Sequence, residues 1–307
     1  MFININGKIY DLIFLILANL LDETKNKNKK NNRGAPCKIK NNDIFYFEIV
    51  NTIKNGSKWK SILNKDASYT VFYRKHCYWV NNKLYQLAYF ITILYLKQNR
   101  YITYKQINNC YIDSSMIRNK NGIDCIGRNY SDKFKNGTKQ SVIVTENGIP
   151  ISFLLVPSNI HDINTVKETI KNSIIDLNGT KLNKGINIGG DKGYISKNLK
   201  DDLKENNNIN FITDTKENSK NKNSLKYIKF LKKRYIVENF FAWCKNIKKT
   251  QLRYERYIEN FNQIMYLSFG LITQKKIEED NFNINPKIVK IYENKIISNE
   301  RLLYSFL

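Results

Sequence analysis

The residues QSVIVTENGIPISFLLVP, at positions 140–157, restrict the fold of this chain more than any other stretch. They form two runs of β-branched and other apolar residues that are joined through Asn147 and Gly148, a dipeptide that accepts the positive φ angles of a tight turn. We therefore predict a β-hairpin at these positions. The rest of the fold must be compatible with a sheet that contains this hairpin.

Strand and helix patterns alternate around the hairpin. A β-rich run surrounds Asp113, and the short strand GINIG leads directly to GDKGY and Asp191. The expected order is strand, hairpin, helix, strand, helix, strand and helix, which predicts an α/β layer with a mixed sheet. The elements expected after the hairpin are a helix over 163–177 capped by Asp162 or Asn164, a strand over 185–189, a helix over 197–206, a strand over 209–213 and a long helix that contains 234–249.

The region before this layer has a helical pattern. Apolar residues recur at helical spacing from position 41 to Gly56, and Ser57 is placed to cap the short segment SKWKSIL. Two further helices are predicted over 68–80 and 84–96. The pattern of this region therefore predicts a group of short helices separated by polar breaks.

A cluster of cationic residues lies on the third of these helices: Arg74, Lys75 and His76. Short helices with such a cluster suit a helix-turn-helix whose later helix meets DNA. The competing interpretation is an ordinary helical bundle with cations on its solvated face. The pattern alone favours the bundle.

The N-terminal segment over 10–21 is apolar but too short to span a bilayer, and it contains Asp11. We expect an apolar helix of an intracellular protein with no membrane partner. The polar, cationic residues 22–34 that follow predict a flexible linker. The five cysteines are scattered, which argues against disulfides or a zinc site.

The formal net charge is +24, from 51 lysines and arginines against 27 acidic residues. Such a balance attracts polyanions, and nucleic acid is the first candidate partner. The abundance of Asn, Lys, Ile and Tyr also suits an A+T-rich genome, which would add lysines without selection for DNA binding. Charge alone therefore does not decide the function.

Three acids stand out by position: Asp113 in the first strand, Asp191 directly after a later strand, and Glu238 on the C-terminal helix. Each has a structural interpretation, as a strand-end cap, as a turn former beside glycines, and as half of a helical ion pair with Arg234. Taken singly, each residue favours its structural interpretation.

Glu238 fits that interpretation less well than the other two acids. Arg234, Glu238 and Lys245 share a narrow polar stripe on a helix whose remaining circumference is apolar and aromatic. A helix of this kind is buried, so its acid faces either a partner or a cleft. An Arg before a Glu is also the less favourable order for a surface pair.

Phosphodiester chemistry supplies a reason for three such acids. Displacement at a phosphodiester is helped by two divalent cations roughly 3.5 to 4 Å apart. Mg²⁺ prefers carboxylate and water oxygens, and substrate phosphates fill its other positions. Two Asp and one Glu are enough to hold the ions, and Arg234 and Lys245 are placed to hold DNA phosphates.

Several motifs resemble those of DDE-type transposases of prokaryotic insertion sequences. The resemblance runs from about Gly34 to about Lys275 and is strongest to the branch called insertion sequence five, within the insertion-sequence-four-like group. The chain matches the family signature around its glutamate at Arg234, Glu238 and Lys245, but has Leu231 in place of a tyrosine. The motifs are RGAPCKI, NGSKWKSI, YIDSSMIR, GRNYSDKFKNGTKQSVIVTENGIPISFLLVPSNIHD, GDKGYIS and KRYIVENFFAWCKNIKKTQLRYERYIENF.

The resemblance implies an RNase H-like catalytic core in which Asp113, Asp191 and Glu238 bind two Mg²⁺ or Mn²⁺ ions. Water would cut at the element's end, and the freed 3′ hydroxyl would then attack target DNA. The implied partners are the terminal inverted repeats, target DNA and a second copy of the chain. The matched accessory positions near the active site are Lys139, His161 and Asp162, each of which also has a plain structural interpretation.

The expected domains are an apolar helix with a Lys/Asn-rich linker over 1–33, a helical, helix-turn-helix-like DNA-binding domain over 34–105, a catalytic domain over 106–275 and a C-terminal tail over 276–307. The resemblance favours Arg74 and Lys75 as DNA contacts. It also implies a DNA-associated protein of the cytoplasm, or of the nucleus in a eukaryotic host.

Two other functions compete with an active transposase. A domesticated or inactive descendant would act as a DNA-binding regulator, and loss of one of the three acids would favour it. A different RNase H-like nuclease would act on RNA–DNA hybrids or junctions. The N-terminal helical region and the RYERYIENF segment count against that nuclease.

Overall fold

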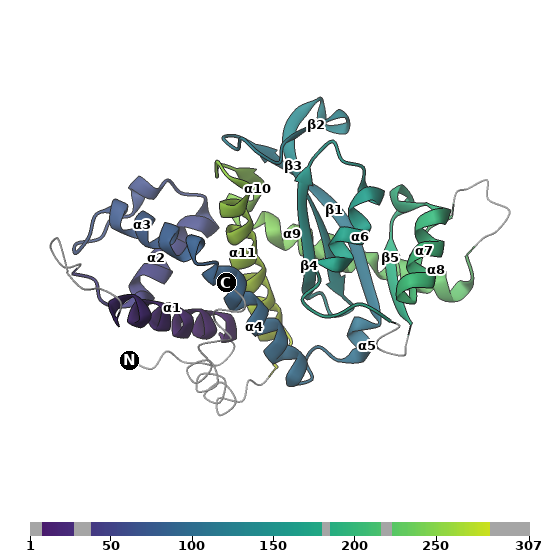
Figure 1. Cartoon of the computed structure of the whole chain (residues 1–307), viewed down its shortest axis with the longest axis horizontal. Helices are drawn as coiled ribbons and strands as arrows, with labels where there is room; N and C mark the ends of the chain where they lie inside the picture. Colours follow the sequence, from purple (N-terminus) through teal and green to yellow (C-terminus); the bar gives the residue numbers. More distant parts are fainter. Residues whose placement is uncertain (1–7, 28–37, 180–184, 216–222, 283–307) are drawn as a thin grey trace. The chain divides into compact units, whose positions relative to one another are not determined.

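The computed structural model describes residues 8–27, 38–179, 185–215 and 223–282 (Figure 1). The chain divides into two compact units. The first, which we call the helical unit, takes in residues 1–92, 246–250 and 259–307. The second, the sheet unit, takes in residues 93–245 and 251–258. The helical unit is therefore assembled from separate parts of the sequence.

The helical unit contains the helices predicted for the N-terminal region. The predicted stop at Gly56 is confirmed, because this residue follows the second helix with a φ of +66° in the left-handed region that glycine favours. The elements of the unit are α1 (Ile9–Lys27), α2 (Asn42–Asn55), η1 (Trp59–Ser61), α3 (Tyr69–Asn81), the first part of α4 (Leu84–Gln98), most of α10 (Lys248–Gln251) and nearly all of α11 (Ile258–Glu279).

An aromatic cluster joins α1 to the other helices of this unit. The ring of Phe14 lies 4.6 Å from that of Tyr46, 5.0 Å from Trp79 and 5.1 Å from Tyr85, measured between centroids. All four side chains are buried. Aromatic burial of this kind contributes much of a core's stability, so α1 is an integral part of the helical unit.

The linker predicted over 22–34 is wrong in its first part. Residues 22–27 continue α1, and Asp22 forms an ion pair with Lys75 of α3 at 2.6 Å. Residues 28–34 lie outside the described part of the chain. Ser57 also does not cap the next segment, which is a short 3₁₀ turn with Lys58 at its N-cap position.

The cationic cluster on α3 separates into three different environments. Lys75 is bound to Asp22 and its side chain is only 15% exposed. His76 is buried, with Nδ1 2.9 Å from the Tyr85 hydroxyl, and burial together with Lys249 lowers its pKa to about 3. The imidazole is therefore neutral at physiological pH. Arg74 is the member of the cluster that is exposed.

The sheet unit has the predicted mixed sheet. Strand β1 (Asn109–Asn119) pairs antiparallel with β3 (Lys135–Thr145) and parallel with β5 (Ile186–Gly190). The remaining pairings are β3 antiparallel with β2 (Gly127–Asn129) and β4 (Pro150–Pro157), β5 parallel with β6 (Ile209–Thr213), and the end of β1 parallel with β7 (Leu252–Arg253).

The predicted hairpin is formed by β3 and β4. Residues 146–149 connect the two strands, and the Thr145 N–H donates to the Ile149 carbonyl at 2.9 Å across this loop. Gly148 has a φ of +81°, whereas Asn147 keeps a negative φ. The loop therefore needs one glycine rather than the pair of residues with positive φ that the dipeptide suggests.

Helices cover both faces of this sheet. The helices α6 (Asp162–Lys171) and α9 (Tyr235–Lys245) lie on opposite faces (Figure 1). Side chains alternate across a strand, so Ser114 faces α6 and its neighbour Asp113 faces α9. The other elements of the unit are α5 (Tyr104–Ile107), η2 (Tyr130–Asp132), η3 (Lys192–Tyr194), α7 (Lys197–Asn207), α8 (Leu225–Leu231) and η4 (Lys232–Arg234).

Two predicted helices differ in their boundaries. The helix predicted over 163–177 ends at Lys171, and His161 takes the N-cap position in place of Asp162 or Asn164. The single long C-terminal helix is instead interrupted, because η4 separates α8 from α9 and a further break at residues 246–247 precedes α10. Hydrophobic periodicity continues across such breaks and does not report them.

Contacts group α11 with the helical unit, although the boundaries expected from the sequence assign most of it to the catalytic domain. The Gln86 N–H donates to the Gln263 side chain at 3.2 Å, and the Gln274 side chain donates to Asp11 at 3.0 Å. No helix within the described residues is both long and apolar enough to cross a membrane.

Candidate active site

Asp113 lies in the middle of β1, opposite Val142 of β3. Its side chain is 21% exposed on the face that α9 covers. The Ser114 N–H donates to Oδ1 of Asp113 at 2.8 Å, which fixes the carboxylate against the strand backbone. Asp113 thus lies on a central strand of the sheet, which is paired with β3 on one side and β5 on the other.

Asp191 follows the last residue of β5 and caps the 3₁₀ turn η3. Its Oδ1 accepts from the Gly193 N–H at 2.7 Å. Because β5 runs parallel to β1 with Tyr111 opposite Gly189, the strand directs Asp191 toward the level of Asp113. Asp191 therefore has the turn-forming role considered from the sequence, and the register of the strands also brings it to the level of Asp113.

Glu238 belongs to the first turn of α9, with its side chain 61% exposed. The opposite side of this helix is buried and carries Val237, Phe240, Phe241 and Cys244. These apolar side chains hold α9 against the sheet and leave Glu238 on the solvated side. The polar stripe inferred from the sequence is broader in the structure, because Tyr235, Asn239 and Ala242 are exposed together with Glu238 and Lys245, and Arg234 precedes α9.

Arg234 lies between two of the three acids. Its Nη2 is 3.7 Å from Oδ2 of Asp113 and 3.9 Å from Oε1 of Glu238. The sequence interpretation in which Arg234 contacts DNA instead of pairing with Glu238 is incomplete, because in the structure it pairs with both carboxylates. Arg234 can reach both acids because it is the last residue of η4 (Lys232–Arg234). This position lies one turn before Glu238 and within reach of Asp113 on β1.

The charges of Asp191 and Glu238 act on Asp113. The pKa of Asp113 is raised to about 6, chiefly by burial; the Ser114 N–H and Arg234 oppose the rise, and the nearby charges of Asp191 and Glu238 add to it. This coupling brings residues from β1, the end of β5 and α9 into one electrostatic cluster. Clustered acids with a perturbed pKa are typical of functional sites.

A second group of polar residues lies on the opposite face of β1. The Lys139 ammonium donates to Oδ1 of Asp162 at 2.7 Å and to the Ile160 carbonyl at 2.6 Å. Oδ1 of Asp162 also accepts from the Ser114 hydroxyl at 2.6 Å, and the Tyr194 hydroxyl donates to Ser114 at 3.3 Å. This group connects β1, which carries Asp113, to η3, the turn that follows Asp191.

The other predicted site residues lie outside this cluster. Lys245 is exposed at the end of α9, and its carbonyl accepts from the Gln251 side chain. His161 is exposed at the N-cap position of α6 and its side chain makes no capping hydrogen bond. Lys75 is engaged by Asp22 within the helical unit, which counts against its predicted contact with DNA.

The family model for the transposase DDE domain matches residues 107–272, more than half of the chain. The chain belongs to this family. The match includes all three acids, together with Arg234 and Lys245. No curated protein sequence matches the chain.

This DDE transposase also resembles a solved transposase in fold. A synaptic complex of the piggyBac transposase with hairpin DNA gives a TM-score of 0.54 at 14% identity, over 91% of this chain and 76% of that chain. A pre-cleavage Mos1 transpososome covers 92% of this chain and 100% of that chain at 10% identity. Its TM-score of 0.27 is too low to indicate a shared fold.

DDE transposases generally use divalent metal ions, so we tested the site of this transposase for their ligands. Carboxylates are the donors that Mg²⁺ prefers, and the cluster already attracts the cationic Arg234. Within the described residues, however, no three His, Cys, Asp or Glu side chains gather closely enough to hold an ion. The donors fit a divalent cation in type, but in this arrangement two of them, Asp113 and Glu238, pair with Arg234.

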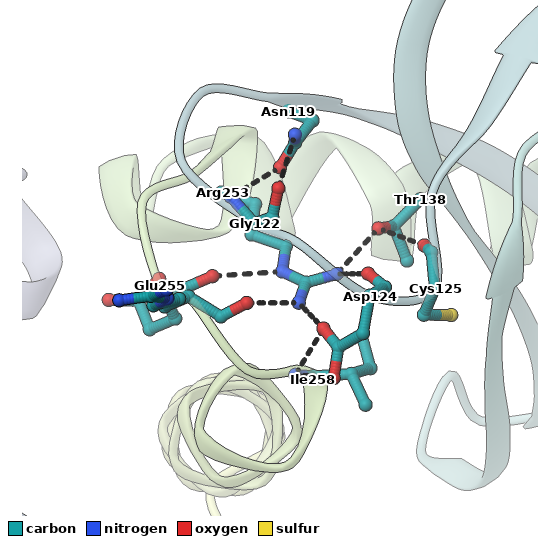
Figure 2. A network of polar contacts seen from close by, with 9 residues as sticks. Asn119, Gly122, Asp124, Cys125, Thr138, Arg253, Glu255 and Ile258 are labelled. Atoms are coloured by element: carbon teal, nitrogen blue, oxygen red, sulfur yellow. Dashed lines mark hydrogen bonds and ion pairs between the residues drawn. The ribbon is translucent and has the colours of Figure 1, made fainter.

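Sequence reasoning missed Arg253 of this transposase, which is fully buried in the sheet unit. Figure 2 shows its guanidinium surrounded by acceptors from the Asp124 loop, β3 and the turn before α11. Nε donates to the Glu255 carbonyl, Nη1 to the Asp124 carbonyl and Thr138, and Nη2 to Oδ1 of Asp124 and the Arg256 carbonyl. In the sequence, the one feature that could have pointed to Arg253 was its position in the LRYERYIENF motif.

Proposed function

We propose that this transposase uses Asp113, Asp191 and Glu238 as metal-binding carboxylates to cut DNA at the ends of a mobile element and to join those ends to target DNA. The observation that carries the proposal is the electrostatic cluster that joins β1, the end of β5 and α9. A match to the DDE domain model over the same residues supports it.

Each residue of the cluster has a distinct role in this proposal. Asp113, which is 21% exposed, would hold the two ions together with Asp191 and Glu238. When bound, Mg²⁺ or Mn²⁺ ions would activate the attacking oxygen and stabilise the leaving oxygen. Arg234 and Lys245 hold DNA phosphates on either side of Glu238.

The second polar group keeps the ligands in place. The ion pair of Lys139 with Asp162, and the hydroxyls of Ser114 and Tyr194, link the far face of β1 to the turn after β5. A site of this kind needs its ligands held within a fraction of an ångström. We assign Lys139 and Asp162 to this positioning role, and leave exposed His161 as an accessory residue.

We further propose that the sheet unit has an RNase H-like core and that the chain belongs to the insertion sequence five branch. Three antiparallel strands followed by two parallel ones support the core. The helical unit would bind the terminal inverted repeats, with Arg74 as its exposed cation. A homodimer or larger assembly on paired ends, associated with DNA inside the cell, completes the proposal.

The proposal is tested with the purified protein, Mg²⁺ or Mn²⁺, and DNA that carries the inverted repeats flanking its gene. The wild-type protein should nick or cleave this DNA. Glu238→Gln should reduce cleavage by more than about 100-fold, the upper range for loss of a group that only supports a metal ligand, while DNA binding stays largely intact. Electrophoretic mobility and cleavage assays measure the two effects.

A matched control is Glu205→Gln, which removes the same charge from an exposed position on α7. It should leave both cleavage and binding unchanged. Equal activity of Glu238→Gln and wild type would refute the catalytic assignment.

A further inference from the structure

Arg234 takes the position of a cation in the carboxylate cluster. Its side chain is 17% exposed, and its Nη2 lies near both Asp113 and Glu238, at 3.7 and 3.9 Å. The ion pairs of these two acids within the described residues involve no other cation. The neighbouring Lys233 instead binds Glu146 at 2.6 Å, so it does not neutralise the cluster.

The geometry of Arg234 is poor for a permanent ion pair. Strong arginine–carboxylate pairs are bidentate, with N···O distances of about 2.7 to 2.9 Å. Both distances here are longer, and Nε is buried without a hydrogen-bond partner among the described residues. A buried donor without a partner costs free energy, so Arg234 gives up little when it leaves this position.

A guanidinium and a divalent cation cannot neutralise the same carboxylates at once. The three acids raise each other's energy when no cation is near, and Arg234 reduces that repulsion in the metal-free protein. The two cations should therefore exclude one another.

We propose that Arg234 is the internal counter-ion of the metal-free site, and that a divalent cation displaces it and frees its guanidinium for a DNA phosphate. This inference rests on the proposed function, because it takes Asp113 and Glu238 as metal ligands. Displacement couples the two binding events: metal strengthens DNA binding, and DNA strengthens metal binding by the same factor.

Metal affinity without DNA tests the displacement. Mn²⁺ binding is measured by calorimetry at pH 8, above the pKa of about 6 for Asp113, so that the acid is ionised in the wild-type protein. Arg234→Gln removes the competing charge and should bind Mn²⁺ about 5-fold or more tightly than wild type. Arg234→Lys keeps a cation and should stay close to wild type. The control Lys233→Gln, whose partner is Glu146, should also match wild type.

Thermal unfolding separates this role from simple packing. Without metal, Arg234→Gln should have a lower Tm than wild type because the acids repel one another. Saturating Mn²⁺ should raise its Tm by more than it raises that of wild type. A purely structural arginine would lower the Tm equally with and without metal, and that result would overturn the inference.

The wild-type protein provides a test that does not depend on the stability of a variant. The NMR signal of the Arg234 Nε–H group, identified by its loss in Arg234→Lys, should shift when Mg²⁺ is added. An unmoved signal at saturating Mg²⁺, or unchanged or weaker Mn²⁺ affinity in Arg234→Gln, would overturn the inference. If wild type binds no metal, or Glu238→Gln binds it equally well, the proposed metal site itself fails, which is a distinct result.

Discussion

At the scale of single residues, Arg253 shows how much one buried side chain can organise. All five guanidinium N–H groups have acceptors, and these come from segments that are far apart in the sequence (Figure 2). Asp124 also accepts from the Ile258 N–H at 2.9 Å. Arg253 therefore fixes the loop after β1 to the segment that leads into α11.

We expect Arg253→Lys to destabilise the protein by about 3 kcal/mol, because lysine cannot reach five acceptors and leaves buried polar groups unpaired. Urea-induced unfolding measures the loss. The control is Arg256→Lys, at an exposed neighbouring position. The backbone carbonyl of residue 256 still accepts from Arg253 in this variant, so stability should change by less than about 0.5 kcal/mol. Equal midpoints for Arg253→Lys and wild type would contradict the structural role.

At the scale of elements, the segment α8, η4 and α9 delivers Arg234 and Glu238 to the sheet. Phe230 of α8 stacks on Tyr111 of β1, with ring centroids 5.0 Å apart. Gly189 of β5 makes this possible, since a Cβ there would lie 2.9 Å from the Phe230 ring and 3.1 Å from the Tyr111 ring. The absence of one side chain thus sets the height of α8 above the sheet.

Gly189→Ala should displace Phe230 and lower stability by roughly 1 to 3 kcal/mol, the usual cost of overpacking. Cleavage should fall further than stability alone explains, because η4 and α9 follow α8 directly. Urea unfolding and the cleavage assay give the two values. Gly185→Ala is the matched control: its nearest neighbour would be 3.5 Å away, so wild-type behaviour is expected there. If both variants behave alike, the close approach of Phe230 is not important.

At the scale of the whole molecule, the helical unit is completed by a helix from the other end of the sequence. Tyr10 of α1 packs on Gly270 of α11, and the ring of Tyr89 lies 6.1 Å from that of Tyr266. Many side chains of α11 are buried, among them Phe261, Ile264 and Met265. The N-terminal helices therefore lack part of their core until α11 is present.

A fragment of residues 1–92 should consequently not unfold cooperatively. Without α11 it exposes apolar surface that normally lies against that helix, and small domains have little stability to lose. The same fragment joined by a flexible linker to residues 246–307 should regain a cooperative thermal transition. Circular dichroism on heating measures both, and a cooperative transition of the 1–92 fragment by itself would contradict the discontinuous unit.

The sequence by itself determined several local elements and supplied the three acids as a hypothesis. The Gly148 hairpin, the end of α2 at Gly56 and the strand that leads to Asp191 follow from turn chemistry and side-chain periodicity, which act between residues close in the sequence. The family motifs placed Asp113, Asp191 and Glu238 together as a hypothesis. These features needed no knowledge of long-range contacts.

Only the tertiary structure decided the partners of the charged residues. Arg234 pairs with Asp113 as well as with Glu238, Lys75 pairs with Asp22, and Arg253 is buried on Asp124. The sequence also did not indicate that α11 belongs to the helical unit. A charge meets whichever opposite charge the folded chain brings near it, and periodicity along the sequence carries no information about contacts between distant segments.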